Sequence, residues 1–276
     1  MKNEIYEPNK YLKLGIKIWP TMFGELRDCK DLIWHLFKRD ITAKYKQSIF
    51  GCLWALIMPF IAIGTFMYLN RAGIFNIGDV GIPYPVYALI GLSVFQLFST
   101  GLVAGCNSLV SAGDMITKIN FPRESLVIAS LAQTIFEFVI KLILIVLFFI
   151  IYRFVPSWHI IFLPLVIMPV IILTLGLSLI LSLLNGILRD TANVVSLLMS
   201  FLMFLTPVLY PVPQKQSYLF NLNPLTPLIS APRDIIAYGA IQKPVEYGVA
   251  SAIAILIFFI AWRIFHLVET KIPERI

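Results

Sequence analysis

Three polar residues interrupt a long apolar segment at a regular spacing. Gln133, Glu137 and Lys141 are each four residues apart, so a helix would stack their side chains along one face. A lone charge at mid-bilayer costs about 2.5–3.5 kcal/mol, so we expect this polar stripe to face the interior of a helix bundle. Either the stripe binds a polar substrate along a pathway, or Glu137 and Lys141 neutralise each other and clasp neighbouring helices. We favour the clasp, because opposite charges one turn apart satisfy each other without a substrate.

Other patterns that would indicate catalysis are absent from the sequence. His35, His159 and His266 lie far apart, which does not predict a metal site, and there is neither a GxxxxGK[ST] phosphate loop nor an HExxH motif. We therefore expect no ATP hydrolysis, no enzyme activity and no bound cofactor in this chain. The enzymatic alternative is a membrane-embedded transferase acting on lipid-linked sugars, for which Glu137 paired with Lys141 is the one buried catalytic candidate.

The composition is that of a membrane protein. Of 276 residues, 59% are hydrophobic and 13% are charged, against about half and a quarter in soluble domains. In a soluble protein the net charge of +7 would suggest nucleic acid. Here the Lys and Arg residues crowd the first 48 residues, which favours contact with anionic lipid headgroups and argues against nucleic acid.

Six apolar segments come close to the roughly 20 residues that a helix needs to cross a bilayer. They cover residues 49–69, 86–105, 126–152, 160–188, 193–210 and 245–266. This pattern predicts an all-α polytopic membrane protein with six transmembrane helices in a single domain over residues 1–276. Residues 1–48 would precede the bundle, 49–266 would form it, and 267–276 would be a short tail. Residues 1–30 hold no uninterrupted apolar core, so we expect the first span to direct insertion.

The distribution of cations predicts the orientation. If residue 1 lies in the cytoplasm, 16 of the 22 Lys and Arg residues fall inside and five outside, with Lys141 in a span. The positive-inside rule therefore predicts that both termini are cytoplasmic.

Two further segments are amphipathic. Residues 26–45 predict a helix in the membrane interface, with an ordinary soluble helix as the alternative. Its apolar face would be made by Leu26, Leu32, Ile33, Leu36, Phe37 and Ile41. Residues 211–244 combine prolines with apolar residues, which predicts short re-entrant helices; the alternative is a loop resting on the outer surface.

Aromatic residues are frequent on the first and fifth predicted spans. Packing or interface anchoring accounts for most such side chains. Should these spans line a conduit for sugars, the same rings would stack on pyranose faces. The candidates are Trp54, Phe60, Phe66, Tyr68, Phe201, Phe204 and Tyr210.

Five fragments in order along the chain resemble one family. They are "RDITAKYKQSIFGCLWALIMP", "KINFPRE", "GILRDTANV", "TPVLYPVP" and "NLNPLTPLISAPRDII". They resemble the membrane subunit of type-2 ABC exporters, particularly the permeases for O-antigen, other surface polysaccharides or teichoic acid. Drug and antibiotic exporters share this fold and stay an alternative.

The resemblance implies a homodimeric permease in the bacterial cytoplasmic membrane that works with two copies of a separate ATPase, which would bind ATP and Mg²⁺. A lipid-linked polysaccharide would be the substrate. The resemblance also implies that the interface helix and the short cytoplasmic loops dock the ATPase. The candidate docking residues are Arg39, Asp40, Tyr45, Lys46, Asp114, Lys118, Phe121, Arg123, Arg189 and Asp190.

Overall fold

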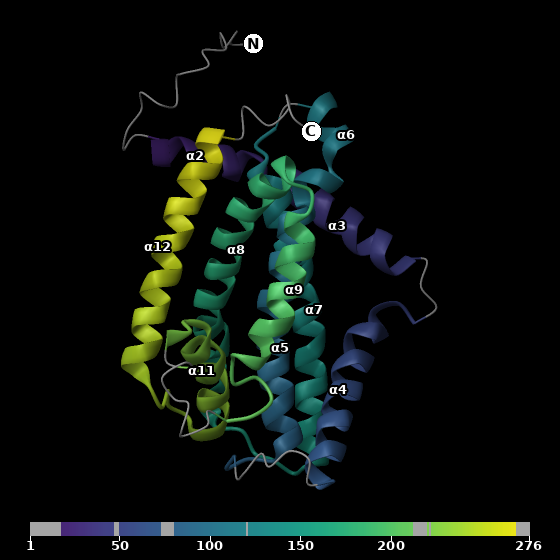
Figure 1. Cartoon of the computed structure of the whole chain (residues 1–276), viewed down its shortest axis with the longest axis vertical. Helices are drawn as coiled ribbons and strands as arrows, with labels where there is room; N and C mark the ends of the chain where they lie inside the picture. The colour runs from purple at the N-terminus through teal and green to yellow at the C-terminus, as the bar shows by residue number, and fades with distance from the viewer. Residues whose placement is uncertain are drawn as a thin grey trace.

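The computed structural model of the chain describes residues 18–46, 50–72, 80–119, 121–211, 220 and 222–268. Within these ranges the regular structure is helical and no strand occurs, which confirms the all-α class. Labels follow Figure 1. The α-helices are α2 (Ile18–Asp28), α3 (Lys30–Lys46), α4 (Trp54–Arg71), α5 (Tyr84–Ser111), α6 (Gly113–Lys118), α7 (Glu124–Ile151), α8 (Leu163–Ile187), α9 (Thr191–Phe204), α11 (Leu225–Tyr238) and α12 (Pro244–Val268); the 3₁₀ turns are η2 (Gly51–Leu53) and η3 (Trp158–Phe162).

Among the described residues, four helices are long and apolar enough to cross a membrane: α5, α7, α8 with η3, and α12. The other two predicted spans correspond to α4 and α9, which are shorter apolar helices. The fifth span was expected to reach residue 210, but α9 ends at Phe204. Pro207 explains the early end, because its ring has no N–H to donate and it disfavours helical backbone in the residue before it.

The helix bundle has two ends that differ in structure (Figure 1). We call the end with α2, α6, the turn between α8 and α9, and the last turn of α12 the α6 end. The opposite end, with α11 and η3, is the α11 end.

The predicted interface helix over 26–45 is two helices rather than one, with a turn at Cys29 between α2 and α3. The two helices pack on different partners. Phe23 of α2 meets Trp262 of α12 with ring centroids 4.7 Å apart, whereas Phe37 of α3 meets Phe136 of α7 at 6.2 Å. The chain bends at Cys29 because no straight helix could reach both.

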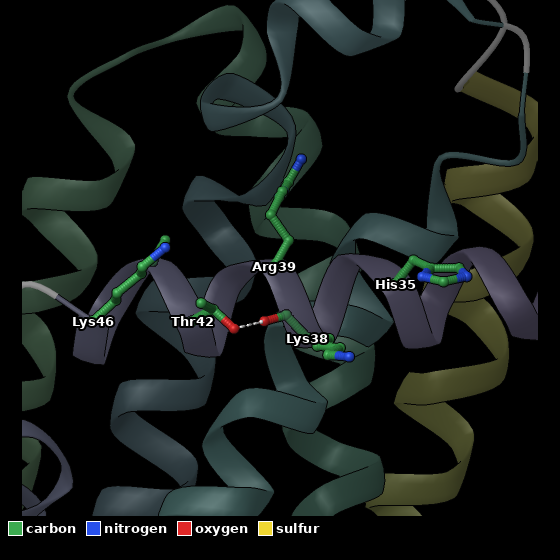
Figure 2. Close-up of a pocket in the computed structure, with 6 residues that line it drawn as sticks. His35, Lys38, Arg39, Thr42 and Lys46 are labelled. Atoms are coloured by element: carbon green, nitrogen blue, oxygen red, sulfur yellow. Dashed lines mark hydrogen bonds between the residues drawn. The ribbon is translucent and has the colours of Figure 1, made fainter.

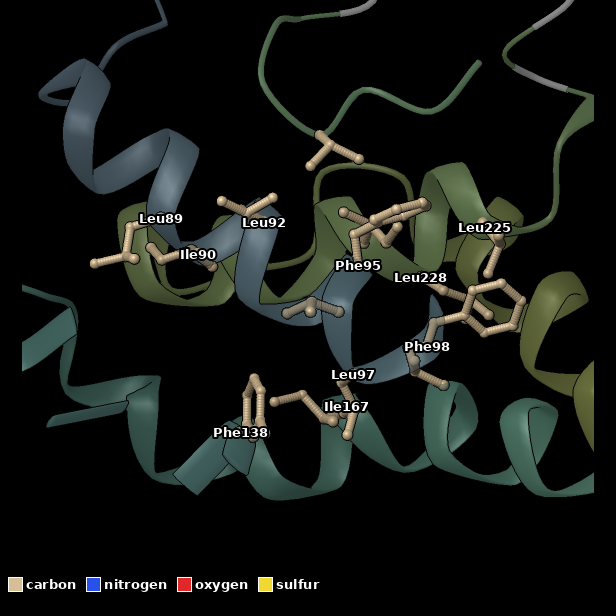
Figure 3. Packing of buried hydrophobic residues seen from close by; sticks show 14 of the residues in the cluster. Leu89, Ile90, Leu92, Phe95, Leu97, Phe98, Phe138, Ile167, Leu225 and Leu228 are labelled. Carbon is tan, nitrogen blue, oxygen red and sulfur yellow. The ribbon is translucent and has the colours of Figure 1, made fainter. Parts of the chain in front are cut away.

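The centre of the bundle is α5, which packs against α4, α7, α8, α9 and α11. Figure 3 shows its apolar side chains between neighbouring helices, with Phe138 of α7, Ile167 of α8 and Leu228 of α11 around them. Phe98 of α5 is only 2% exposed. Helix α5 also approaches α8 closely. An added Cβ on Gly101 would lie 2.9 Å from Thr174, and one on Gly105 would collide with Ser178. Small residues at this spacing let the two backbones approach closely, which is how helices associate in lipid.

Two described parts of the segment between α9 and α12, residues 206–209 and helix α11, are largely buried. Helix α11 packs on α5, α8, α12 and η3. Residues 206–209 are buried without being helical, and their polar groups find partners in the following segment. Asn223 Nδ2 donates to the Leu205 carbonyl (3.1 Å) and to Thr206 Oγ1 (2.9 Å), and Arg233 donates to the Val208 carbonyl at 2.5 Å. Irregular backbone at membrane depth requires such protein partners. Residues 212–219 of the predicted re-entrant segment lie outside the described residues.

Candidate coupling surface and membrane charge cluster

Two of the predicted docking segments meet directly. Arg39 of α3 pairs with Asp40 (Nε–Oδ1 2.8 Å) and also directs Nη1 at the sulfur of Met115 on α6, 3.8 Å away. Met115 and Leu36 both belong to an apolar cluster at the α6 end. The structure therefore brings residues 39–40 and the short helix with Asp114 and Lys118 together, although 76 residues separate Arg39 from Met115.

The predicted docking residues differ in exposure. Six are exposed: Arg39, Lys46, Asp114, Lys118, Arg189 and Asp190. Four are half-buried: Asp40, Tyr45, Phe121 and Arg123. Of these, Phe121 packs on the apolar cluster that contains Leu36 and Ile116, so it contributes to packing in this chain.

One face of α3 is hollowed and basic. A hollow of about 450 Å³ is lined by His35, Lys38, Arg39, Thr42, Ala43 and Lys46. In Figure 2 the Arg39 side chain extends away from the middle of α3, with Lys46 near one end of the hollow and His35 near the other. Thr42 Oγ1 donates to the Lys38 carbonyl (2.7 Å), so this hydroxyl is satisfied within the helix. Lys38, Arg39 and Lys46 make this face positively charged, which is complementary to an acidic surface.

A buried asparagine supports the turn that presents Arg189 and Asp190. Asn185 is 2% exposed, and its Nδ2 donates to the Cys106 carbonyl (3.1 Å) and to Asn107 Oδ1 (3.2 Å). Its Oδ1 accepts from the backbone N–H of Ala192 at 3.3 Å. Asn185 therefore fixes the turn between α8 and α9 to the end of α5. The sequence analysis did not identify this residue; its one signal is an amide at the end of an apolar segment.

A second buried network joins the start of α7 to the end of α12. Glu124, 2% exposed, accepts from Trp262 Nε1 at 3.1 Å and lies 3.1 Å from His266 Nδ1. Glu124 lies in the "KINFPRE" fragment, but nothing local indicates a partner 142 residues away. This network anchors α7 beside the predicted docking residues Phe121 and Arg123.

The partner of Glu137 differs from the expected one. The predicted clasp paired Glu137 with Lys141, but Glu137 Oε1 forms an ion pair with Lys44 Nζ of α3 at 2.5 Å. The reason is tertiary: α3 packs across α7 and delivers an ammonium group directly to the carboxylate. Lys141 is buried, 4% exposed, one turn further along α7, and Gln133 is half-buried. Lys44 was the missed member of this group.

The candidate pathway aromatics are divided between two helices. Trp54, Phe60 and Tyr68 on α4 and Phe201 and Phe204 on α9 are exposed. Phe66 and Tyr210 are half-buried, and Tyr210 donates a hydrogen bond to the Phe204 carbonyl. Helix α4 packs on α5 and α7, and α9 packs on α5 and α8. The two sets therefore lie on separate helices, and the hollow on α3 is lined by other residues.

These features define a multi-pass helical membrane protein whose α6 end presents charged turns and an amphipathic helix. Residues 31–237 match the family described as ABC-2 type transporter. The match covers well over half of the chain, so the chain belongs to the ABC-2 type transporter family, as its five sequence fragments had indicated.

Three proteins described as O-antigen export permeases are similar to most of the chain. The O-antigen export system permease protein RfbA of Myxococcus xanthus is 27% identical over 261 residues, which is 91% of this chain and 98% of that protein. Two proteins of Klebsiella pneumoniae with the same description are 29% and 27% identical over 220 residues. Each of these alignments covers 77% of this chain and 82% of the relative.

Proposed function

We propose that this chain is the permease subunit of an ABC exporter that moves a lipid-linked, O-antigen-like polysaccharide across the bacterial cytoplasmic membrane. The observation that carries the proposal is the similarity to O-antigen export permeases over 77% or more of the chain. Membership of the ABC-2 family supports the transporter class. The energy would come from a separate ATPase that binds ATP and Mg²⁺.

In this proposal α4 and α9 complete a bundle of six spans with both termini in the cytoplasm. Helix α4 has 18 residues, or about 27 Å at 1.5 Å per residue, close to the hydrocarbon thickness of about 30 Å. The α6 end would then be cytoplasmic, in agreement with its concentration of Lys and Arg. Helix α11 would be re-entrant and cap the outer exit, which its burial against α5, α8 and α12 supports.

A second copy of the chain would cover the exposed faces of α4 and α9. Phe60, Tyr68, Phe201 and Phe204 are between 58% and 72% exposed. A pathway between two protomers would be lined by such rings, on which pyranose faces stack while the lipid stays near the bilayer.

The ATPase would dock at the α6 end on the exposed charges of α3, α6 and the turn between α8 and α9. Motion of α3 would reach the membrane through the Lys44–Glu137 ion pair, and motion of α6 would reach α3 through the Arg39–Met115 contact. Because α5 packs on most of the other helices, it would stay as the fixed frame against which α4 and α9 move.

Deletion of the gene and complementation test the proposal. We expect the deletion strain to accumulate lipid-linked polymer in the cytoplasm and to lose it from the cell surface, and the wild-type gene to restore export. We expect Lys118→Glu to reach the membrane but to restore about a tenth of export or less, because it reverses an exposed docking charge.

Arg153→Glu is the matched control, since Arg153 is an exposed cation just after the end of α7, the end away from α6. It should restore export fully. Normal surface polysaccharide in the deletion strain would refute the proposed function, and equal export by the two variants would refute the docking surface. Co-purification of the ATPase with each variant separates loss of docking from loss of transport.

A further inference from the structure

A cation is buried where α5, α11 and the irregular backbone after α9 meet. Arg233 of α11 is 4% exposed, and its Nη2 donates to the Val208 carbonyl at 2.5 Å. Among the residues that the structure describes, no carboxylate forms an ion pair with it. The neighbouring Asp234 instead accepts from the backbone N–H of Gln242 at 3.1 Å. The guanidinium of Arg233 is therefore stabilised by something other than an ion pair.

Helix α5 supplies the surface on which this guanidinium lies. The Arg233 Cζ atom is 3.9 Å from the centre of the Tyr87 ring, a distance at which the ring face attracts a cation. One helical turn further along α5, Gly91 leaves the backbone bare. A Cβ added there would collide with both the Arg233 guanidinium and the Val208 carbonyl. The aromatic ring and the glycine of α5 together accommodate this one hydrogen-bonded pair.

The pair fixes a part of the chain that follows a loosely packed helix. Within α9, Val195 alone is buried. The backbone after α9 is not helical, and polar contacts hold it: Asn223 donates to the Leu205 carbonyl at 3.1 Å, and Arg233 donates to Val208. Asn223 joins this backbone to the start of α11, whereas Arg233 also lies on α5. Arg233 is therefore a direct polar link between the end of α9 and the central helix of the bundle.

A polar link of this kind can be broken and remade. An ionisable residue buried in a membrane protein is costly, and such residues usually serve a function; an apolar side chain would fill the same space without that cost. A hydrogen bond to one carbonyl holds a single position and weakens steeply when the two groups separate. The contact with Tyr87 does not involve α9, so the guanidinium can keep its place on α5 while the carbonyl leaves and returns.

We propose that Arg233 is a positioning residue for the outer end of the export pathway. It holds the Val208 carbonyl on α5 while the exit is closed and releases this carbonyl when α9 moves away. The inference rests on the proposed function, in which α9 moves relative to α5 and the α11 end faces outward. It adds to that function the contact that resists opening, so loss of the guanidinium should leave this end open without any nucleotide.

Labelling with a water-soluble maleimide tests this role. The probe is Val208→Cys in a full-length chain whose three natural cysteines are replaced, measured in nanodiscs first by itself and then with the ATPase and ATP. Val208 is fully buried, so we expect slow labelling without nucleotide and faster labelling during ATP hydrolysis. Arg233→Met should raise the rate without nucleotide about tenfold, the effect of losing one hydrogen bond from a charged donor. ATP should then add little.

Matched variants separate positioning from a general loss of packing. Tyr87→Phe keeps the ring under the guanidinium and should label at the wild-type rate, whereas Tyr87→Leu removes the ring and should label faster. A second probe, Leu89→Cys, is buried on α5 and should stay unlabelled in every variant. If Arg233→Met exposes this second probe as well, the variant has lost its packing, and the comparison of Tyr87→Leu with Tyr87→Phe decides the question.

Two results would overturn the positioning role. One is equal labelling of Val208→Cys in the chain with Arg233 and in Arg233→Met. The other is a labelling rate that ATP leaves unchanged in a complex that exports polymer. Failure of the proposed function gives a different result: export would be normal without the gene, while Arg233→Met would still label faster in the isolated chain. That result would refute the exporter and keep Arg233 as the residue that closes this end of the chain.

Discussion

Helices α5 and α9 are both rich in Leu, Val and Phe, yet they are packed very differently. Most residues of α5 are buried, whereas Val195 alone is buried in α9, all of whose residues the structure describes. Helix α4 resembles α9, with exposed residues on much of its surface. The difference shows that α5 is a frame that one chain completes, whereas α4 and α9 are surfaces that a single chain leaves open. In the membrane these open faces would meet either lipid or, as proposed above, a second copy of the chain.

Truncation of one phenylalanine on each helix tests this contrast most directly, because the two losses in the free energy of unfolding should differ most. Phe98 of α5 is 2% exposed and Phe201 of α9 is 61% exposed. We expect Phe98→Ala to lower the free energy of unfolding by about 3 kcal/mol, because a cavity remains in a tightly packed core. Phe201→Ala should change it by about 0.5 kcal/mol or less. Unfolding of the monomer in mixed detergent micelles measures both, and equal losses would show that α9 is as packed as α5.

A pair of glycine substitutions sharpens the comparison between α5 and α4. Added methyl groups should have opposite effects, since a Cβ on Gly105 collides with Ser178 while one on Gly64 of α4 meets nothing within 4 Å. Gly105→Ala should destabilise the monomer by about 1–3 kcal/mol through overpacking. Gly64→Ala should stabilise it by up to about 1 kcal/mol, because alanine is the better helix former.

The same micelle assay measures the two variants. Loss of stability in Gly64→Ala would mean that α4 is covered within one chain. If Gly64→Ala is stable but lowers export, the effect lies in contacts between copies.

The smallest expected effect is a pH dependence of stability that arises from Asp234 in α11, a helix that packs on α5. Burial raises the pKa of Asp234 from 3.8 to about 6, although the Gln242 backbone N–H and Arg233 oppose this shift. A raised carboxyl pKa means that the folded chain binds this proton more tightly than the unfolded chain. Stability should therefore fall as the pH rises from about 4 to 6. The Tm of wild type should be higher at pH 5 than at pH 8, and Asp234→Asn should reduce that difference. An identical pH dependence in both proteins would contradict this assignment.

The sequence predicted the local features of the chain well. Apolar length located α5, α7, α8 and α12, and the five fragments indicated the family. It missed α6 because a six-residue helix between two longer ones produces no separate apolar segment. It placed one helix over 26–45 because the amphipathic pattern continues through Cys29, and it extended the fifth span past Phe204 because Thr206–Leu209 are as apolar as a helix would be.

The sequence identified two residues of the charge cluster in the membrane helices, but not which residue pairs with which. Glu137 and Lys141 were recognised as a polar stripe, but the partner of Glu137 is Lys44, 93 residues away in sequence. Asn185 and Glu124 were missed altogether, because their partners lie on other helices at distances along the chain that no periodicity encodes.

The sequence by itself determined that this chain is a helical membrane protein, where its apolar segments fall, and which side chains share one face of a helix. Only the tertiary structure decided which faces meet. In lipid, a protein-facing surface is as apolar as a lipid-facing one, so hydrophobicity cannot distinguish them. Close contacts of small residues such as Gly105 with Ser178, and polar pairs such as Lys44 with Glu137, make that choice.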